Sequence, residues 1–108
     1  MQRSKAEGYI GLCMKAGKLT CGFNAIEIQR GKIYLLLLCA TASENAKKSA
    51  RKLSVKFGCP IFLTEGKTLE EIIGKPNCKL AAVRDENLAK AIVASADEEY
   101  RIYSGGNV

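Results

Sequence analysis

Lysine and arginine side chains gather in one stretch of the chain, where their type and spacing suit the binding of phosphate groups. The basic residues of the stretch are Lys47, Lys48, Arg51, Lys52 and Lys56. At about 100° per residue, its apolar residues fall in one narrow arc and the basic ones occupy the rest of the circumference. The pattern predicts a helix with one face packed against the core and one positively charged face. The alternative interpretation is that the positive face is only solvated and binds nothing.

The positive charge belongs to the first half of the chain. Residues 1–56 carry eleven Lys and Arg against three Asp and Glu, whereas residues 57–108 carry six against eight. The two halves therefore have charges of +8 and −2, which add to the net charge of +6. This asymmetry is typical of a protein that binds a polyanion through one surface.

Residue types give little support to catalysis or metal binding. The chain has no histidine, so it lacks the commonest general base and every Ser-His or Cys-His pair. Its cysteines are Cys13, Cys21, Cys39, Cys59 and Cys78. They are odd in number and form no CxxC pair, which favours free, mostly buried thiols over a zinc site or disulfides. We expect no enzyme activity, no cofactor and no metal.

Targeting signals are also missing from the sequence. The first residues carry charge without a following apolar core, and no segment approaches the ~18 apolar residues of a membrane span. A cytoplasmic protein without a membrane partner is expected.

Helical and extended patterns alternate along the chain and predict one α/β domain, residues 1–108, with helices on both faces of a sheet. The expected helices are 5–16, 25–30, 44–57, a short one ending at residue 74, and 86–94. The expected strands are 19–21, 33–40, 61–63 and 79–83, followed by a less regular tail. The expected helix caps are Ser4, Asn24, Ser43, Thr68 and Asp85.

Two segments carry a resemblance to a known family. Residues 11–22 read GLCMKAGKLTCG and residues 42–48 read ASENAKK, with Asn24 and the apolar strand between them. In order and spacing the chain resembles the ribosomal protein L-seven-Ae family of kink-turn-binding proteins, and most closely its bacterial YlxQ-like branch. The likeness covers roughly residues 3–94.

The resemblance implies a three-layer α/β/α sandwich with a four-stranded mixed sheet, no catalysis, and binding of structured RNA. The RNA would be ribosomal or another kinked helix, with the ribosome as a further partner and no DNA. Gly22 would let the backbone approach RNA, and Asn24 would bond a base or sugar edge. Ser43 and Asn45, with Lys47 and Lys48, would meet the RNA backbone. From the positive helix face itself, we expect Lys47, Lys48, Arg51 and Lys52 to contact phosphates.

Four residues leave alternatives open. Phe23 either stacks on an unpaired base or anchors the following helix, and its large apolar area favours the anchor. Arg84 follows the strand at 79–83 and is a candidate contact in a second RNA-facing loop. Ala25 and Ile28 stand where the family usually has polar residues, so structured RNA in general is expected ahead of kink-turn specificity.

Other functions are compatible with the same fold. One alternative is a protein-interaction module that docks a partner through a strand edge or through the acidic residues 97–99. A weaker rival is the substrate-binding part of an RNA-modifying enzyme. Salt-sensitive binding of RNA separates the first two interpretations.

Overall fold

The computed structural model describes residues 5–64, 69–74, 78–96 and 100–102. Its helices are α1 (Lys5–Lys15), α2 (Phe23–Glu27), α3 (Glu44–Phe57), α4 (Leu69–Ile73) and α5 (Glu86–Ala94). Its strands are β1 (Leu19–Cys21), β2 (Leu35–Cys39), β3 (Ile61–Thr64), β4 (Leu80–Val83) and β5 (Tyr100–Ile102). None of these helices has the length and apolar character needed to cross a membrane.

The strands form one mixed sheet in the order β1-β4-β2-β3-β5. β2 pairs in parallel with β3 and antiparallel with β4, while β1 pairs antiparallel with β4. All five residues of β2 are buried, as expected for a strand covered on both faces. The four predicted strands are therefore present, and the predicted fold class is confirmed.

One strand was not anticipated. β5 pairs antiparallel with β3 in the segment where the sequence suggested only an irregular tail. Its backbone register joins Phe62 to Ile102, two residues far apart in the chain. A three-residue edge strand has too little pattern of its own to be detected, because its pairing is entirely non-local.

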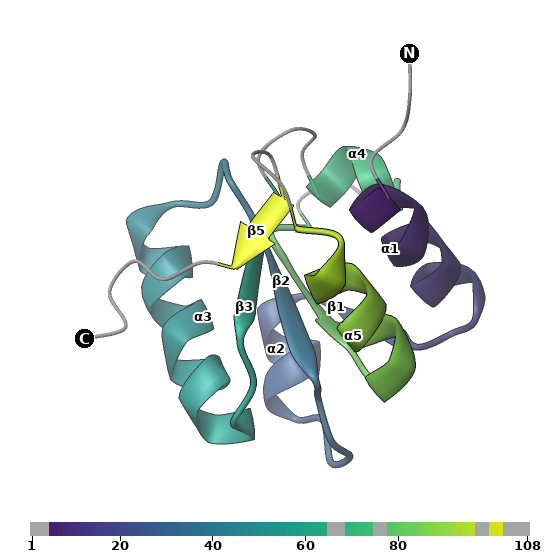
Figure 1. The fold of residues 1–108 in the computed structure, drawn as a ribbon. Helices are drawn as coiled ribbons and strands as arrows, with labels where there is room; N and C mark the ends of the chain where they lie inside the picture. Colours follow the sequence, from purple (N-terminus) through teal and green to yellow (C-terminus); the bar gives the residue numbers. More distant parts are fainter. Residues whose placement is uncertain (1–4, 65–68, 75–77, 97–99, 103–108) are drawn as a thin grey trace.

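Helices cover both faces of the sheet (Figure 1). α1, α4 and α5 pack on one face through a cluster that includes Ile10, Phe62 and Ile92. α2 and α3 pack on the other face through a cluster that includes Ile26, Leu36 and Leu53. The arrangement is a three-layer α/β/α sandwich, with one apolar cluster on each side of the sheet.

Two predicted caps are confirmed at the starts of long helices. The Ser43 hydroxyl oxygen accepts from the Ala46 N–H at 3.1 Å, and Asp85 Oδ1 accepts from the Leu88 N–H at 2.9 Å. Ser4 and Thr68, the other expected caps outside α2, lie outside the described residues. The N-termini of α3 and α5 are therefore fixed by local sequence signals.

The predicted bounds of α2 are wrong at both ends. The helix begins at Phe23 with Gly22 as its N-cap, so Asn24 lies within the first turn and is not the cap. Gly22 has φ 95° and ψ 145°, a conformation that glycine adopts without strain. The helix ends at Glu27, whose carbonyl accepts from Lys56 Nζ at 2.8 Å, and so it stops well before residue 30.

Candidate nucleic-acid interface

The start of β4 brings two loops together at one edge of the sheet. The Gly22 N–H donates to the Leu80 carbonyl at 2.9 Å, directly after β1 ends. The Cys39 N–H donates to the Lys79 carbonyl at 2.9 Å, at the point where β2 leads toward α3. The turn at residues 22–24 and the first turn of α3 therefore belong to the same edge, which we call the α2/α3 edge.

A groove of about 330 Å³ between α2 and α3 includes Phe23 and Asn24 of this turn, so we count the groove as part of the α2/α3 edge. The residues that line it are Phe23, Asn24, Glu27, Ser49, Lys52 and Leu53. Phe23 is half-buried and packs against the apolar cluster beneath α2, which supports its predicted role as an anchor. The groove nevertheless includes Phe23, so the ring also borders the space that a ligand would enter.

Four exposed polar side chains at the α2/α3 edge are available for a ligand. They are Asn24, Asn45, Lys48 and Lys52. Within the described part of the chain, none of the four makes a side-chain hydrogen bond or an ion pair. Ser43 differs, because its hydroxyl oxygen already accepts from the α3 backbone as a cap, while its proton can still be donated.

The basic residues of α3 differ in exposure and in partners across their face of the helix, a difference that the sequence did not indicate. Lys47 and Lys52 are five positions apart, which separates them by about 140° around a helix. Lys47 is half-buried and its ammonium lies 3.5 Å from the Glu44 carboxylate, and Arg51 is half-buried with partners of its own. Lys52 lines the groove and Lys48 is exposed, so these two are the basic side chains of α3 that lie open at the edge.

A curated relative has a closely related sequence. RNA-binding protein YlxQ of Enterococcus faecium is 35% identical over 91 residues, which cover 82% of this chain and 87% of the relative. The chain belongs to the YlxQ family. The YlxQ-like part of the predicted resemblance is thus confirmed, while the wider L-seven-Ae relationship remains an interpretation of the motifs.

A solved structure supports the fold of this YlxQ-family chain. It is described as a protein with unknown function from Bacillus halodurans C, and it matches with a TM-score of 0.70 and 21% sequence identity. The match covers 83% of this chain and 94% of the other. No protein-family model matches the chain.

Arg84 lies at the other end of β4 from the turn at Gly22. Its backbone N–H donates to the Lys18 carbonyl at 2.8 Å, and its guanidinium donates to the Gly17 carbonyl. The Nε atom is buried and has no partner among the described residues. Arg84 therefore braces the loop between α1 and β1, and the structure does not bring it together with the other predicted contacts.

Three residues at or beside the α2/α3 edge were not singled out by sequence reasoning. Glu27 and Ser49 line the groove, and Lys79 lies where β4 begins. No local signal marks them, because each gains its place from elements that are distant in the chain. Glu27 is the least expected of the three, since a carboxylate in the groove repels phosphate.

The thiols are poorly suited to chemistry. All five cysteines are unpaired, and four are buried, as the sequence predicted. Burial raises the pKa of Cys13 to about 11, with Asp85 adding to the rise and Arg84 opposing it. Burial alone raises the pKa of Cys59 to about 11. Both thiols stay protonated near neutral pH and are weak nucleophiles. Within the described residues, no group of three or more Cys, Asp or Glu side chains could hold a metal.

Proposed function

We propose that this YlxQ-family protein binds structured RNA at the α2/α3 edge and catalyses no reaction. The observation that carries the proposal is the group of four exposed side chains there, two amides and two ammonium groups, that lack partners in the described structure. The name of the Enterococcus faecium relative points in the same direction. The positive first half of the chain adds a long-range attraction for a polyanion.

Each part of the edge has a separate task in this proposal. Gly22 has no side chain and lets the RNA backbone approach the turn. The Asn24 amide both donates and accepts, so it can bond a base or sugar edge. Lys48 and Lys52 neutralise phosphates, and the proton-bearing groups of Ser43 and Asn45 bind backbone oxygens at the start of α3.

Recognition is proposed to depend on RNA shape more than on base identity. Ala25 on α2 and Ile28, directly after α2, are both exposed, and Ile28 is 77% exposed. Neither side chain offers a polar group to a base edge. An unpaired polar group on a base costs about 1–3 kcal/mol once it is buried against such residues. We therefore propose structured RNA in general, with kink-turns and ribosomal RNA as specific candidates and the ribosome as a further partner.

Salt-dependent binding tests the proposal. The protein is titrated into labelled RNA hairpins with and without a kink-turn, and into duplex DNA of matched sequence, over a series of salt concentrations. Each neutralised phosphate contributes about −0.7 to −0.9 to the slope of log affinity against log salt. We expect RNA to bind with at least two such contacts and more tightly than DNA. Absence of salt-dependent binding to either nucleic acid would favour the protein-interaction alternative. Equal binding of RNA and DNA would mean general attraction to phosphates and would contradict recognition of structured RNA.

The identity of the RNA is a separate question. Ultraviolet crosslinking in cells followed by sequencing of the attached RNA identifies it directly. Enrichment of one ribosomal segment or one hairpin supports the proposed ribosomal or kinked target. Reads spread in proportion to RNA abundance would argue for binding without a preferred structure.

A further inference from the structure

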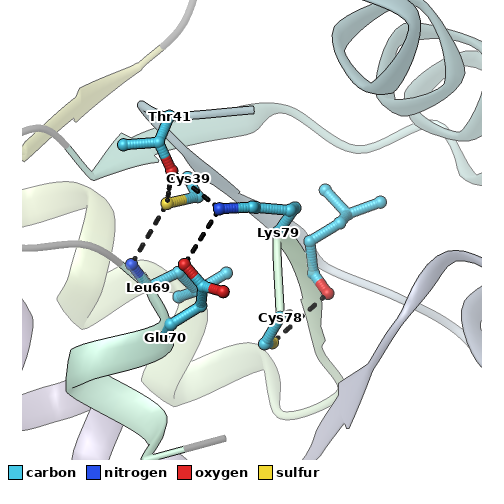
Figure 2. Close-up of polar contacts among 7 residues, drawn as sticks. Cys39, Thr41, Leu69, Glu70, Cys78 and Lys79 are labelled. Atoms are coloured by element: carbon cyan, nitrogen blue, oxygen red, sulfur yellow. Dashed lines mark hydrogen bonds and ion pairs between the residues drawn. The ribbon is translucent and has the colours of Figure 1, made fainter. Parts of the chain in front are cut away.

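A polar network joins three segments next to the proposed interface (Figure 2). Lys79 Nζ donates to Thr41 Oγ1 at 3.0 Å and to Glu70 Oε1 at 2.9 Å. Because an ammonium group can only donate, the Thr41 oxygen is the acceptor and its own proton is free to reach Cys39 Sγ, 3.1 Å away. The Leu69 N–H donates to the same sulfur at 3.4 Å. The network thus ties the loop at residues 40–42 to α4 and β4.

Lys79 and its neighbour Leu80 hold both halves of the α2/α3 edge. The Leu80 carbonyl accepts from Gly22, whereas the Lys79 carbonyl accepts from Cys39. The Lys79 side chain adds a third attachment, to Thr41, which lies two residues before the Ser43 cap of α3. The beginning of β4 therefore determines how the turn at residues 22–24 and the start of α3 lie relative to each other.

Among the described residues, the charge of Lys79 is compensated by an ion pair, unlike the charges of the exposed lysines Lys48 and Lys52 on α3. Its ammonium is paired with the Glu70 carboxylate, and both side chains are only partly exposed, at 32% and 26%. The hydrogen bond to Glu70 raises the pKa of Lys79, so the side chain remains charged near neutral pH. Lys48 and Lys52 have no such counter-charge among the described residues. A lysine that is already neutralised is suited to holding loops together.

We propose that Lys79 is a positioning residue for RNA binding, which holds the loop at residues 40–42 through Thr41 and does not itself neutralise a phosphate. The inference rests on the proposed RNA-binding function. It predicts that breaking the link between Lys79 and Thr41 weakens binding by displacing Ser43 and Asn45, which are uncharged, while the number of phosphates neutralised by lysine side chains stays the same.

The test compares Lys79→Met and Thr41→Val with the parent protein. Met keeps the apolar stem of Lys79, and Val keeps the shape of Thr41 at an exposed position. We expect each variant, and the double variant, to bind a structured RNA about fivefold or more weakly. The double variant should be no weaker than the weaker single variant, because both remove one link. Lys90→Met is the matched control, since it also removes a lysine from an ion pair, with Glu86 at 3.5 Å, and should bind like the parent.

The salt slope separates positioning from direct contact. A positioning role leaves the slope of Lys79→Met equal to that of the parent, whereas loss of a phosphate contact makes it shallower by about 0.7–0.9. The shallower slope would overturn the proposal. Parent-like affinity of both single variants would overturn it as well.

Amide hydrogen exchange tests the link without RNA. Both variants should speed exchange at the Ala42 and Ala46 N–H groups and leave the Cys59 N–H, at the far end of α3, unchanged. If exchange changes in this way but the parent binds no RNA, the link exists and the proposed function is wrong. If the parent binds RNA and exchange does not change, the function stands and the positioning role is wrong.

Discussion

Polar and basic side chains lie near both ends of β4, but they differ in whether they contact other parts of the chain. At its start, in the α2/α3 edge, Asn24 and Lys52 are exposed and lack partners in the described structure. At its end, Arg84 donates to the Gly17 carbonyl, Asp85 caps α5, and Cys13 Sγ donates to the Lys18 carbonyl at 3.3 Å. Near the start, Asn24 and Lys52 are exposed beside the network of Lys79, whereas the side chains named at the other end hold the chain together.

The comparison shows that positive charge alone does not define a binding surface. Arg84 and Lys52 were both candidate RNA contacts in the sequence, yet Lys52 lines the groove between α2 and α3 while Arg84 holds the loop between α1 and β1. The same distinction divides α3, where Lys47 pairs with Glu44 on one flank while Lys48 is exposed without a described partner. A donor that is already occupied must break its contact before it binds phosphate, which reduces the gain.

The largest expected effect tests the difference between the two flanks of α3. Replacing Lys48 and Lys52 together by Ala should weaken RNA binding about ten- to hundredfold and make the salt slope shallower by about 1.4–1.8, which corresponds to two phosphates. Replacing Lys47 and Arg51 by Ala removes the same charge from the other flank and should change both quantities much less. Fluorescence titrations of the two double variants measure this. Equal losses would mean that the whole circumference of the helix contacts RNA.

The second prediction concerns the other end of β4. Arg84→Met removes the brace on the Gly17 carbonyl and should lower the free energy of unfolding by about 1–3 kcal/mol. RNA affinity should stay at the parent value under conditions where the variant is folded. Urea denaturation and the same titrations measure the two quantities. A variant of parent stability that has lost RNA affinity would place Arg84 in the interface.

A smaller effect is expected at Asn24, which the structure removes from the cap position. Asn24→Asp loses the amide donor and adds a charge facing phosphate, so RNA affinity should fall about tenfold. An acidic residue in the first turn of α2 suits the helix dipole, so the melting temperature should be preserved. Asn24→Ala should change stability by less than about 0.5 kcal/mol, because no cap is lost. If Asn24→Asp binds like the parent, Asn24 does not contact RNA.

The smallest effect should be a gain. Glu27 lines the groove opposite Lys52, so Glu27→Gln should strengthen RNA binding about two- to threefold by removing repulsion of phosphate. Its backbone carbonyl would still accept from Lys56, which keeps the end of α2 intact. Glu86→Gln, on α5, is the control of equal charge and should leave binding unchanged. Equal gains from both variants would mean that the effect depends only on the net charge of the protein.

Local signals were sufficient for much of the fold. The continuously apolar run predicted a central buried strand, and β2 is that strand. Ser43 and Asp85 were predicted as caps because their side chains act on amides only three residues away. The start of α2 was misplaced because a glycine with positive φ can begin a helix without any side-chain signal, while Asn24 offered a familiar but unused one.

Features that depend on strand order could not be derived from the sequence. Arg84 directly follows a strand, but the end of the sheet to which it belongs depends on the antiparallel pairing of β4 with β1 and β2. The link between Lys79 and Thr41 joins residues 38 positions apart and has no periodic pattern. The candidate site was therefore predictable in its residue types and in the turn at Gly22, but not in which basic side chains remain open.

Lysine footprinting with and without RNA tests the central claim most directly, because it needs no substitution. The exposed amines of the parent protein are acetylated briefly, in the free state and bound to a structured RNA, and the modified lysines are quantified by mass spectrometry. We predict protection of Lys48 and Lys52, with unchanged reactivity at Lys18 and Lys90, which are exposed elsewhere on the molecule. Protection of Lys18 or Lys90 with Lys48 and Lys52 still reactive would contradict binding at the α2/α3 edge.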